Sequence, residues 1–294
     1  MTKFICEIGS NHNQDFERTI ELIREAKRAG CWGVKFQLFR AEYLYAPEFK
    51  DHIAKMKQWE LPIDFIPHIK LECNKLGLVF LCTPFDLDVI EALYPYVDLF
   101  KIGSYELQWF PLIKAIVKTG KPWIFSTGMT ANINEIMWPV VLGQDYNNPP
   151  YAILHCNSNY PAKPEHCNLS KIKEIKKLLD KYPFNKIQTG WSDHTRNPEL
   201  VLTAIAQGAE IVEFHFDLED GLGFETEFSH CWKPSEARAM INRAKFIDTY
   251  GMMLLGKKEW IHSEPNEQEA SKWRTDPEDG LRPLKKYRKE LLND

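Results

Sequence analysis

The amino-acid sequence predicts a (β/α)8 barrel, or TIM barrel, with a short polar C-terminal extension. Two observations support this fold class. Apolar segments with strand character alternate with segments whose apolar residues recur at helical spacing, and eight such strand segments occur. A length of 294 residues also suits one barrel of about 250 residues plus an extension. We expect the barrel at residues 1–255 and a partly irregular extension at residues 256–294.

The predicted strands follow one another in β-then-α units along the chain. Asp86 and Asn168 precede two of the helical segments and are expected to be N-caps, because their side chains can accept hydrogen bonds from the first free amides. An open sheet is the alternative, although it usually has fewer strands or an extra domain. The eight predicted strands are residues 3–9, 33–39, 78–82, 97–102, 122–127, 151–156, 186–190 and 210–216.

One connection is much longer than the others. Residues 40–77 separate the second and third strands and include Tyr43, Tyr45, Trp59 and a predicted helix from Asp64. Long connections at the mouth of a barrel often cover the site beneath them. We therefore expect this segment to lie over the candidate site.

The composition excludes several classes of protein. A net charge of −4 without a long basic run argues against nucleic acid as a partner. The seven scattered cysteines indicate reduced core thiols, and neither a signal peptide nor an apolar run of about 20 residues is present. The sequence predicts a cytoplasmic protein with no membrane partner.

Charged side chains occupy positions that would face the interior of the barrel. Side chains alternate along a strand, so the apolar residues of each strand can pack on helices and leave the intervening residues inside. Lys35, Lys101, Glu7 and Glu213 are such residues. Their presence predicts either internal salt bridges or a charged ligand, and for each residue alone both interpretations stay open.

Two histidines follow consecutive predicted strands. His194 and His215 would lie side by side at the mouth, an arrangement that suits a first-row divalent metal. A lone histidine is typically a hydrogen-bonded structural residue, and we expect this of His155 at the end of the sixth strand. Small hydroxyls at strand ends, including Thr83 and Ser126, form a candidate cradle for phosphate or carboxylate oxygens.

Eight motifs, in this order, resemble the sialic acid synthase family, the N-acetylneuraminate synthases and their relatives. The resemblance extends from about Phe4 to Ile241. The motifs are EIGSNHN (7–13), VKFQLF (34–39), CTPFD (82–86), FKIGSYEL (100–107), TGKP with FSTGM (119–129), LHCNSNYP (154–161), GWSDHT (190–195) and VEFHF (212–216).

The resemblance implies a nonulosonic acid synthase, which condenses phosphoenolpyruvate with an N-acylated amino-sugar aldehyde and releases phosphate. It implies a divalent metal, Mn²⁺ or Mg²⁺, on His194 and His215. Glu7 and Gln37 would lie at the reacting centre, Glu7 as a proton-handling or water-positioning group. The residues implied to contact the substrates are Lys35, Thr83, Lys101, Ser104, Glu106, Ser126, Ser158 and Tyr160.

The sequence departs from the family pattern in three places. The family's acidic-loop Asp aligns with Glu227, with Glu225 as a competitor. The antifreeze-like C-terminal domain of two-domain members has no counterpart, and Arg274 or Arg282 could supply its arginine unless the tail is simply solvated. The third departure is the bulky segment 230–232, whose Trp232 would either line the sugar pocket or pack beneath the next helix.

Two other functions stay open at this level. One is an aldolase or lyase that uses a Schiff-base lysine, and the other is a non-catalytic homologue that binds metal and phosphoenolpyruvate. The sequence does not identify the acceptor sugar, and a homo-oligomer is compatible with it.

Overall fold

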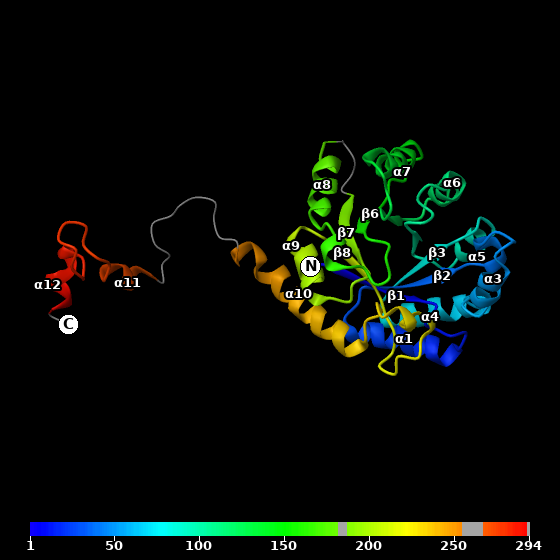
Figure 1. Ribbon diagram of the computed structural model, residues 1–294, viewed down its shortest axis with the longest axis horizontal. Helices are drawn as coiled ribbons and strands as arrows, with labels where there is room; N and C mark the ends of the chain where they lie inside the picture. The colour runs from blue at the N-terminus through cyan, green and yellow to red at the C-terminus, as the bar shows by residue number, and fades with distance from the viewer. Residues whose placement is uncertain (182–186, 255–266, 293–294) are drawn as a thin grey trace. The chain divides into compact units, whose positions relative to one another are not determined.

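Eight parallel strands form a closed ring in chain order, with helices around it (Figure 1). The computed structural model describes residues 1–181, 187–254 and 267–292. The ring confirms the predicted TIM barrel. The strands are β1 (Lys3–Gly9), β2 (Gly33–Leu38), β3 (Val79–Pro84), β4 (Leu99–Ile102), β5 (Trp123–Ser126), β6 (Ala152–Cys156), β7 (Gln188–Asp193) and β8 (Ile211–His215).

Strand β7 runs further toward the barrel mouth than the sequence predicted. The predicted segment ended at Gly190, whereas the strand ends at Asp193, and Lys186 lies outside the described residues. Of the added residues, Ser192 and Asp193 are polar, whereas Trp191 is buried in the core. Pairing with β8 keeps them extended, and Trp232 Nε1 donates to Asp193 Oδ2 at 3.0 Å. Their polar groups are therefore satisfied inside the fold.

Local signals explain where several helices begin and end. Asp15 caps the helix α1 by accepting from the Arg18 amide, and Gly30 ends it in the left-handed conformation. Asp86 accepts from the amides of residues 88 and 89, as an N-cap would. The helices from α1 to α10 are α1 (Phe16–Ala29), α2 (Ala41–Leu44), α3 (Lys50–Lys57), η1 (Ile63–Phe65), α4 (Ile66–Leu76), α5 (Asp88–Leu93), α6 (Phe110–Lys118), α7 (Ile133–Asp145), η2 (Pro164–His166), α8 (Ser170–Leu179), α9 (Pro198–Ala206), η3 (Phe224–Phe228) and α10 (Pro234–Leu254).

The predicted cap at Asn168 was wrong. Helix α8 begins at Ser170, its N-cap position is Leu169 without a side-chain hydrogen bond, and the Asn168 amide donates to His166 O at 3.2 Å. Asn168 has a φ of 45°, a conformation that Asn tolerates better than most residues. Its side chain therefore stabilises the preceding turn instead of the helix.

The core has two layers separated by the ring of strands. The larger layer lies between strands and helices, and all seven cysteines are buried and free, as predicted. The smaller layer fills the barrel interior, and above it the next inward positions are mostly polar because side chains alternate along each strand. The interior layer consists of Ile5, Leu81, Leu99, Ile124, Ala152, Leu154 and Ile211.

The long connection after β2 packs on the loop that follows β8. Trp59 stacks on Phe224, with ring centroids 5.8 Å apart and planes at 4°. Lys55 of α3 lies 2.8 Å from the Glu227 carboxylate. The connection thus reaches the loop after β8. That it covers the candidate site stays a prediction.

The chain divides into two compact units, residues 1–251 and 252–294. In the second unit, Arg288 pairs with Asp279, and Arg282 Nε donates to Thr275 Oγ1 at 3.1 Å. The proposed role of Arg274 or Arg282 toward the sugar stays a prediction. No helix within the described residues has the length and apolar character needed to cross a bilayer. The helices of the second unit are α11 (Gln268–Lys272), η5 (Lys285–Tyr287) and α12 (Arg288–Leu291).

Candidate active site

Two lysines and two glutamates lie together inside the barrel, directly above the apolar interior layer. Lys35 Nζ is 2.8 Å from Glu7 Oε2 and 4.0 Å from Glu213 Oε1. Lys101 Nζ is 3.7 Å from Glu213 Oε1 and donates to Ser126 Oγ at 2.7 Å. All four charged side chains are buried. The ring closure explains this meeting, because β1 pairs with both β2 and β8.

The buried charges change one another's protonation. Burial raises the pKa of Glu7 to about 7, although Lys35 opposes the shift. Burial also works against ionisation of Glu213, but Lys101 and Lys35 outweigh it and lower the pKa of that carboxyl to about 2. Glu213 is therefore an anion at neutral pH, while Glu7 exchanges its proton near neutrality. Gln37 Nε2 donates to Glu7 Oε1 at 2.6 Å and fixes its orientation.

Hydroxyl and amide groups line the side of the site next to the lysines. Lys35 Nζ donates to Thr83 Oγ1 at 3.3 Å, and the Gly128 amide donates to Ser104 Oγ at 3.0 Å. A Cβ at Gly128 would collide with Ser158 Oγ and lie 2.7 Å from Ser104 Oγ, so only glycine permits this approach. These groups can donate hydrogen bonds to phosphate or carboxylate oxygens.

The structure brings most of the predicted site residues to one cavity, and two of them lie elsewhere. Ser158 lies beside Gly128 and does not line the cavity, and Glu227 points to Lys55 with a side chain 48% exposed. The predicted residues that line the cavity are Glu7, Lys35, Gln37, Thr83, Lys101, Ser104, Glu106, Ser126, Tyr160, His194 and His215, together with Glu213.

The two predicted metal histidines lie next to each other, with ring centroids 5.3 Å apart. His194 Nδ1 is 2.7 Å from Asn157 O, and a carbonyl can only accept, so Nδ1 carries the hydrogen and Nε2 keeps its lone pair. Burial lowers the pKa of His215 well below its usual value, with His194 and Lys35 adding to the effect. His215 can therefore offer a neutral nitrogen to a cation. Burial would lower the pKa of His194, but Cys156 outweighs it and raises that pKa, so Nε2 of His194 offers a lone pair only when the ring has lost its second proton.

Glu225, and not Glu227, is the acidic-loop residue that reaches His215. Glu225 Oε2 is 2.6 Å from His215 Nδ1, and Glu225 Oε1 accepts from the Ser10 amide at 2.7 Å. The carboxylate lies over Gly9, which has a φ of 55° and leaves no room for a Cβ. Of the two glutamates that the sequence left open, Glu225 contacts His215, and its role toward a substrate stays a prediction.

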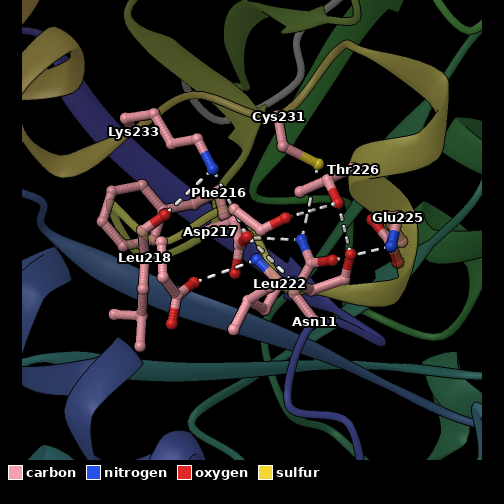
Figure 2. Close-up of polar contacts among 12 residues, drawn as sticks. Asn11, Phe216, Asp217, Leu218, Leu222, Glu225, Thr226, Cys231 and Lys233 are labelled. Atoms are coloured by element: carbon pink, nitrogen blue, oxygen red, sulfur yellow. Dashed lines mark hydrogen bonds and ion pairs between the residues drawn. The ribbon is translucent and has the colours of Figure 1, made fainter.

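The loop after β8 is tied to the loop after β1 (Figure 2). Asn11 accepts from the Glu225 amide at 2.8 Å and donates to Phe216 O at 2.9 Å. Asp217 accepts from the Gly223 amide at 3.0 Å, and Lys233 Nζ lies 3.5 Å from its carboxylate. Arg18 pairs with the same aspartate. These bonds hold Glu225 in position by fixing the backbone on both sides of it.

Sequence reasoning missed a third histidine at the site. The ring centroid of His230 is 4.4 Å from that of His215, and ligand atoms of His215, Glu225, His230 and Cys231 lie within 4.8 Å of one another. His230 sits in a loop without periodicity, so no pattern in the sequence indicated its position. Trp232, in contrast, packs on Phe214 in the core and is not among the residues that line the cavity.

The chain is similar in sequence and in structure to several known proteins. The chain is 34% identical over 249 residues to an uncharacterised protein of Methanocaldococcus jannaschii, covering 84% of this chain and 71% of that protein. It is 32% identical over 237 residues to the N,N'-diacetyllegionaminic acid synthase of Campylobacter jejuni, covering 75% and 69%.

Among solved structures, the chain is similar to the N-acetylneuraminic acid synthetase of Leptospira borgpetersenii in complex with citrate. The TM-score is 0.79 and the identity 28%, with 95% of this chain and 93% of that one covered. The model of the NeuB family matches residues 22–252. The chain therefore belongs to the NeuB family, in agreement with the resemblance to sialic acid synthases.

Proposed function

We propose that this protein is a nonulosonic acid synthase, which condenses phosphoenolpyruvate with an N-acylated amino-sugar aldehyde and releases phosphate. The observation that supports this most is the meeting of Lys35 and Lys101 with a pair of metal-competent histidines in one cavity. The family and the names of the relatives support the same reaction class.

The two lysines would bind the anionic substrate. Phosphoenolpyruvate carries a phosphate and a carboxylate, and both need cations or hydrogen-bond donors when they leave water. Lys101 is held by Ser126 and by Ile102 O, 3.2 Å away, so it already points into the cavity. Burial lowers the pKa of Lys101 more than Glu213 raises it, and an incoming anion would favour its charged form.

Glu7 is the residue that we assign to proton transfer. Its pKa of about 7 lets it accept or donate a proton near neutral pH, and Gln37 and Lys35 keep its carboxyl in place. In the balanced reaction, the methylene carbon of phosphoenolpyruvate bonds to the aldehyde carbon, whose oxygen takes up a proton. Water adds at C2, the C2–O bond to the phosphate breaks, and C2 becomes the keto carbon; one proton of the water replaces that taken by the sugar oxygen and the other leaves with the phosphate. Glu7 would hold or deprotonate that water.

A divalent metal fits the residues at the mouth. His194 and His215 present lone pairs near each other, and His230 has both ring nitrogens without a hydrogen-bond partner in the part of the chain described. When bound, a metal would polarise the carbonyl oxygen of the sugar aldehyde. Tyr160 packs over the His194 ring, with centroids 4.1 Å apart, and would shield this end of the site from water.

A phosphate-release assay tests the proposal. Protein freed of metal with a chelator would be mixed with phosphoenolpyruvate, each of a panel of N-acylated amino-sugar aldehydes, and MnCl₂. Released phosphate would be measured, and the product acid would be identified by mass spectrometry. We expect release only when both substrates and the metal are present, and loss of release in EDTA. Release without any aldehyde, or none with the whole panel, would contradict the proposal.

Borohydride trapping and calorimetry test the two other functions. An aldolase that forms a Schiff base would be labelled covalently by pyruvate and borohydride at Lys35 or Lys101, whereas we expect no label. Calorimetric binding of phosphoenolpyruvate without turnover over the whole panel would instead identify a binding homologue.

A further inference from the structure

His230 is buried beside the predicted metal histidines without a hydrogen bond. Its side chain is 2% exposed, and neither ring nitrogen makes a hydrogen bond of good geometry within the described ranges, where the Phe228 backbone interacts with the ring only weakly. An imidazole has one donor and one acceptor, and leaving buried polar atoms unpaired costs about 1–3 kcal/mol for each. Such a group indicates a partner that the protein atoms do not supply.

The groups around His230 are suited to a cation. His230 Nε2 is 3.9 Å from Glu225 Oε2, and the His215 ring lies 4.4 Å away, centroid to centroid. The Glu225 carboxylate also holds His215 Nδ1 at 2.6 Å, which leaves His215 Nε2 available as a ligand. A carboxylate that orients one imidazole and lies near a second provides negative charge where a divalent ion would need it.

The centroid spacing of the three rings is compatible with one shared ion. An imidazole centroid lies about 3.2 Å from a metal bound to the ring, so two rings on one ion are at most about 6.4 Å apart. The centroid distances are 5.3 Å for His194 and His215, 4.4 Å for His215 and His230, and 6.3 Å for His194 and His230. All three centroid distances satisfy this limit. Ligand atoms of His215 and His230 already lie within 4.8 Å of each other, whereas His194 is outside that group and would have to turn toward it.

Cys231 is the weakest candidate among the four clustered residues. Its sulfur accepts a hydrogen bond from Asn11 Nδ2 at 3.4 Å, and the same amide nitrogen donates to Phe216 O (Figure 2). The thiol therefore already has a partner that His230 lacks. The unpaired imidazole, and not the sulfur, is the group left to complete the site.

We propose that His230 is a third imidazole ligand of the metal bound by His194 and His215, with Glu225 as the carboxylate that positions His215. The inference rests on the metal site of the proposed function and adds a ligand to it. Three imidazoles favour Mn²⁺, Co²⁺ or Zn²⁺ over Mg²⁺, which prefers oxygen ligands. Of the two metals that the sequence left open, Mn²⁺ and Mg²⁺, a third imidazole ligand favours Mn²⁺.

Metal affinity of the full-length chain tests the role of His230 without turnover. Chelated wild-type protein, His230→Gln and His155→Gln would be titrated with CoCl₂ by calorimetry. His155 is a matched control, because it is buried but bonds to Cys167 O at 2.8 Å and packs on Trp191. We expect His230→Gln to weaken Co²⁺ binding at least about tenfold, and His155→Gln to leave it unchanged.

A spectroscopic count of nitrogen ligands covers the case in which the variant does not fold. Pulsed electron paramagnetic resonance of wild-type protein loaded with Cu²⁺ distinguishes two coordinated imidazoles from three. Three would support the proposal. Two imidazoles, unchanged Co²⁺ affinity in folded His230→Gln, or no metal binding by the wild type would each overturn it.

These outcomes are independent of the reaction. Wild-type protein that binds Co²⁺ through three imidazoles but releases no phosphate would leave the ligand assignment standing and refute the proposed function. Phosphate release by a protein whose metal has only two imidazole ligands would support the proposed function and refute the role of His230.

Discussion

Glu106 links the stability of the barrel to pH. The side chain follows β4, is 8% exposed, and has an Oε2 atom without a hydrogen-bond partner among the described residues. Burial raises the pKa of this carboxyl from 4.5 to about 7, and Lys101 and Lys35 compensate only in part. The folded protein therefore holds a proton on Glu106 at pH values where the unfolded chain has released it.

The sign of the effect follows from linkage. A raised pKa in the folded state contributes stability that is fully present below the unfolded value of 4.5 and is lost as the pH rises through the folded value near 7. The shift corresponds to a loss on the order of 3 kcal/mol across this range. Gln resembles the protonated acid, so Glu106→Gln is expected to escape that loss.

Urea unfolding of the wild type and Glu106→Gln, followed by circular dichroism from about pH 5 to about pH 8, measures the difference. We expect the free energy of unfolding of the wild type to fall relative to the variant by about 3 kcal/mol over this range. Other titrating groups, including Glu7, are shared by the two proteins and cancel. Glu91→Gln on the exposed surface of α5 is the control and should follow the wild type. Parallel curves for the wild type and Glu106→Gln would refute the reasoning.

Three further predictions concern the site and the core. Lys101→Met should lower kcat/KM for phosphoenolpyruvate at least about tenfold, because a buried charged hydrogen bond is lost; Lys121→Met, at a partly exposed lysine outside the cavity, should not, and equal effects in a phosphate-release assay would contradict this. Leu154→Ala, in the interior layer, should cost about 2–5 kcal/mol in urea unfolding, and a loss under about 1 kcal/mol would argue against that layer. Glu227→Gln should change the free energy of unfolding by less than about 1 kcal/mol and leave phosphate release unchanged, since its ion pair is exposed. A tenfold loss of release would instead place Glu227 at the reacting centre.

Strand polarity was predictable because it depends only on neighbours in the chain. The alternation that puts Glu7, Lys35, Lys101 and Glu213 inside the barrel can be counted in the sequence. The end of β7 was not predicted correctly. Ser192 and Asp193 are polar, but they continue the strand because β8 and Trp232 provide hydrogen-bond partners. The predicted helix N-cap at Asn168 was wrong for a different reason, because its side chain donates a hydrogen bond within the preceding turn.

The sequence by itself determined the ring of eight strands, the family, and the set of charged and imidazole side chains that face its centre. Only the tertiary structure showed that Glu225, and not Glu227, contacts His215, and only it brought His230 to His215. The loop after β8 has no periodic pattern, and its conformation depends on bonds to Asn11 and Ser10 of the loop after β1. Those contacts join residues more than 200 positions apart, so no local preference of the chain could reveal them.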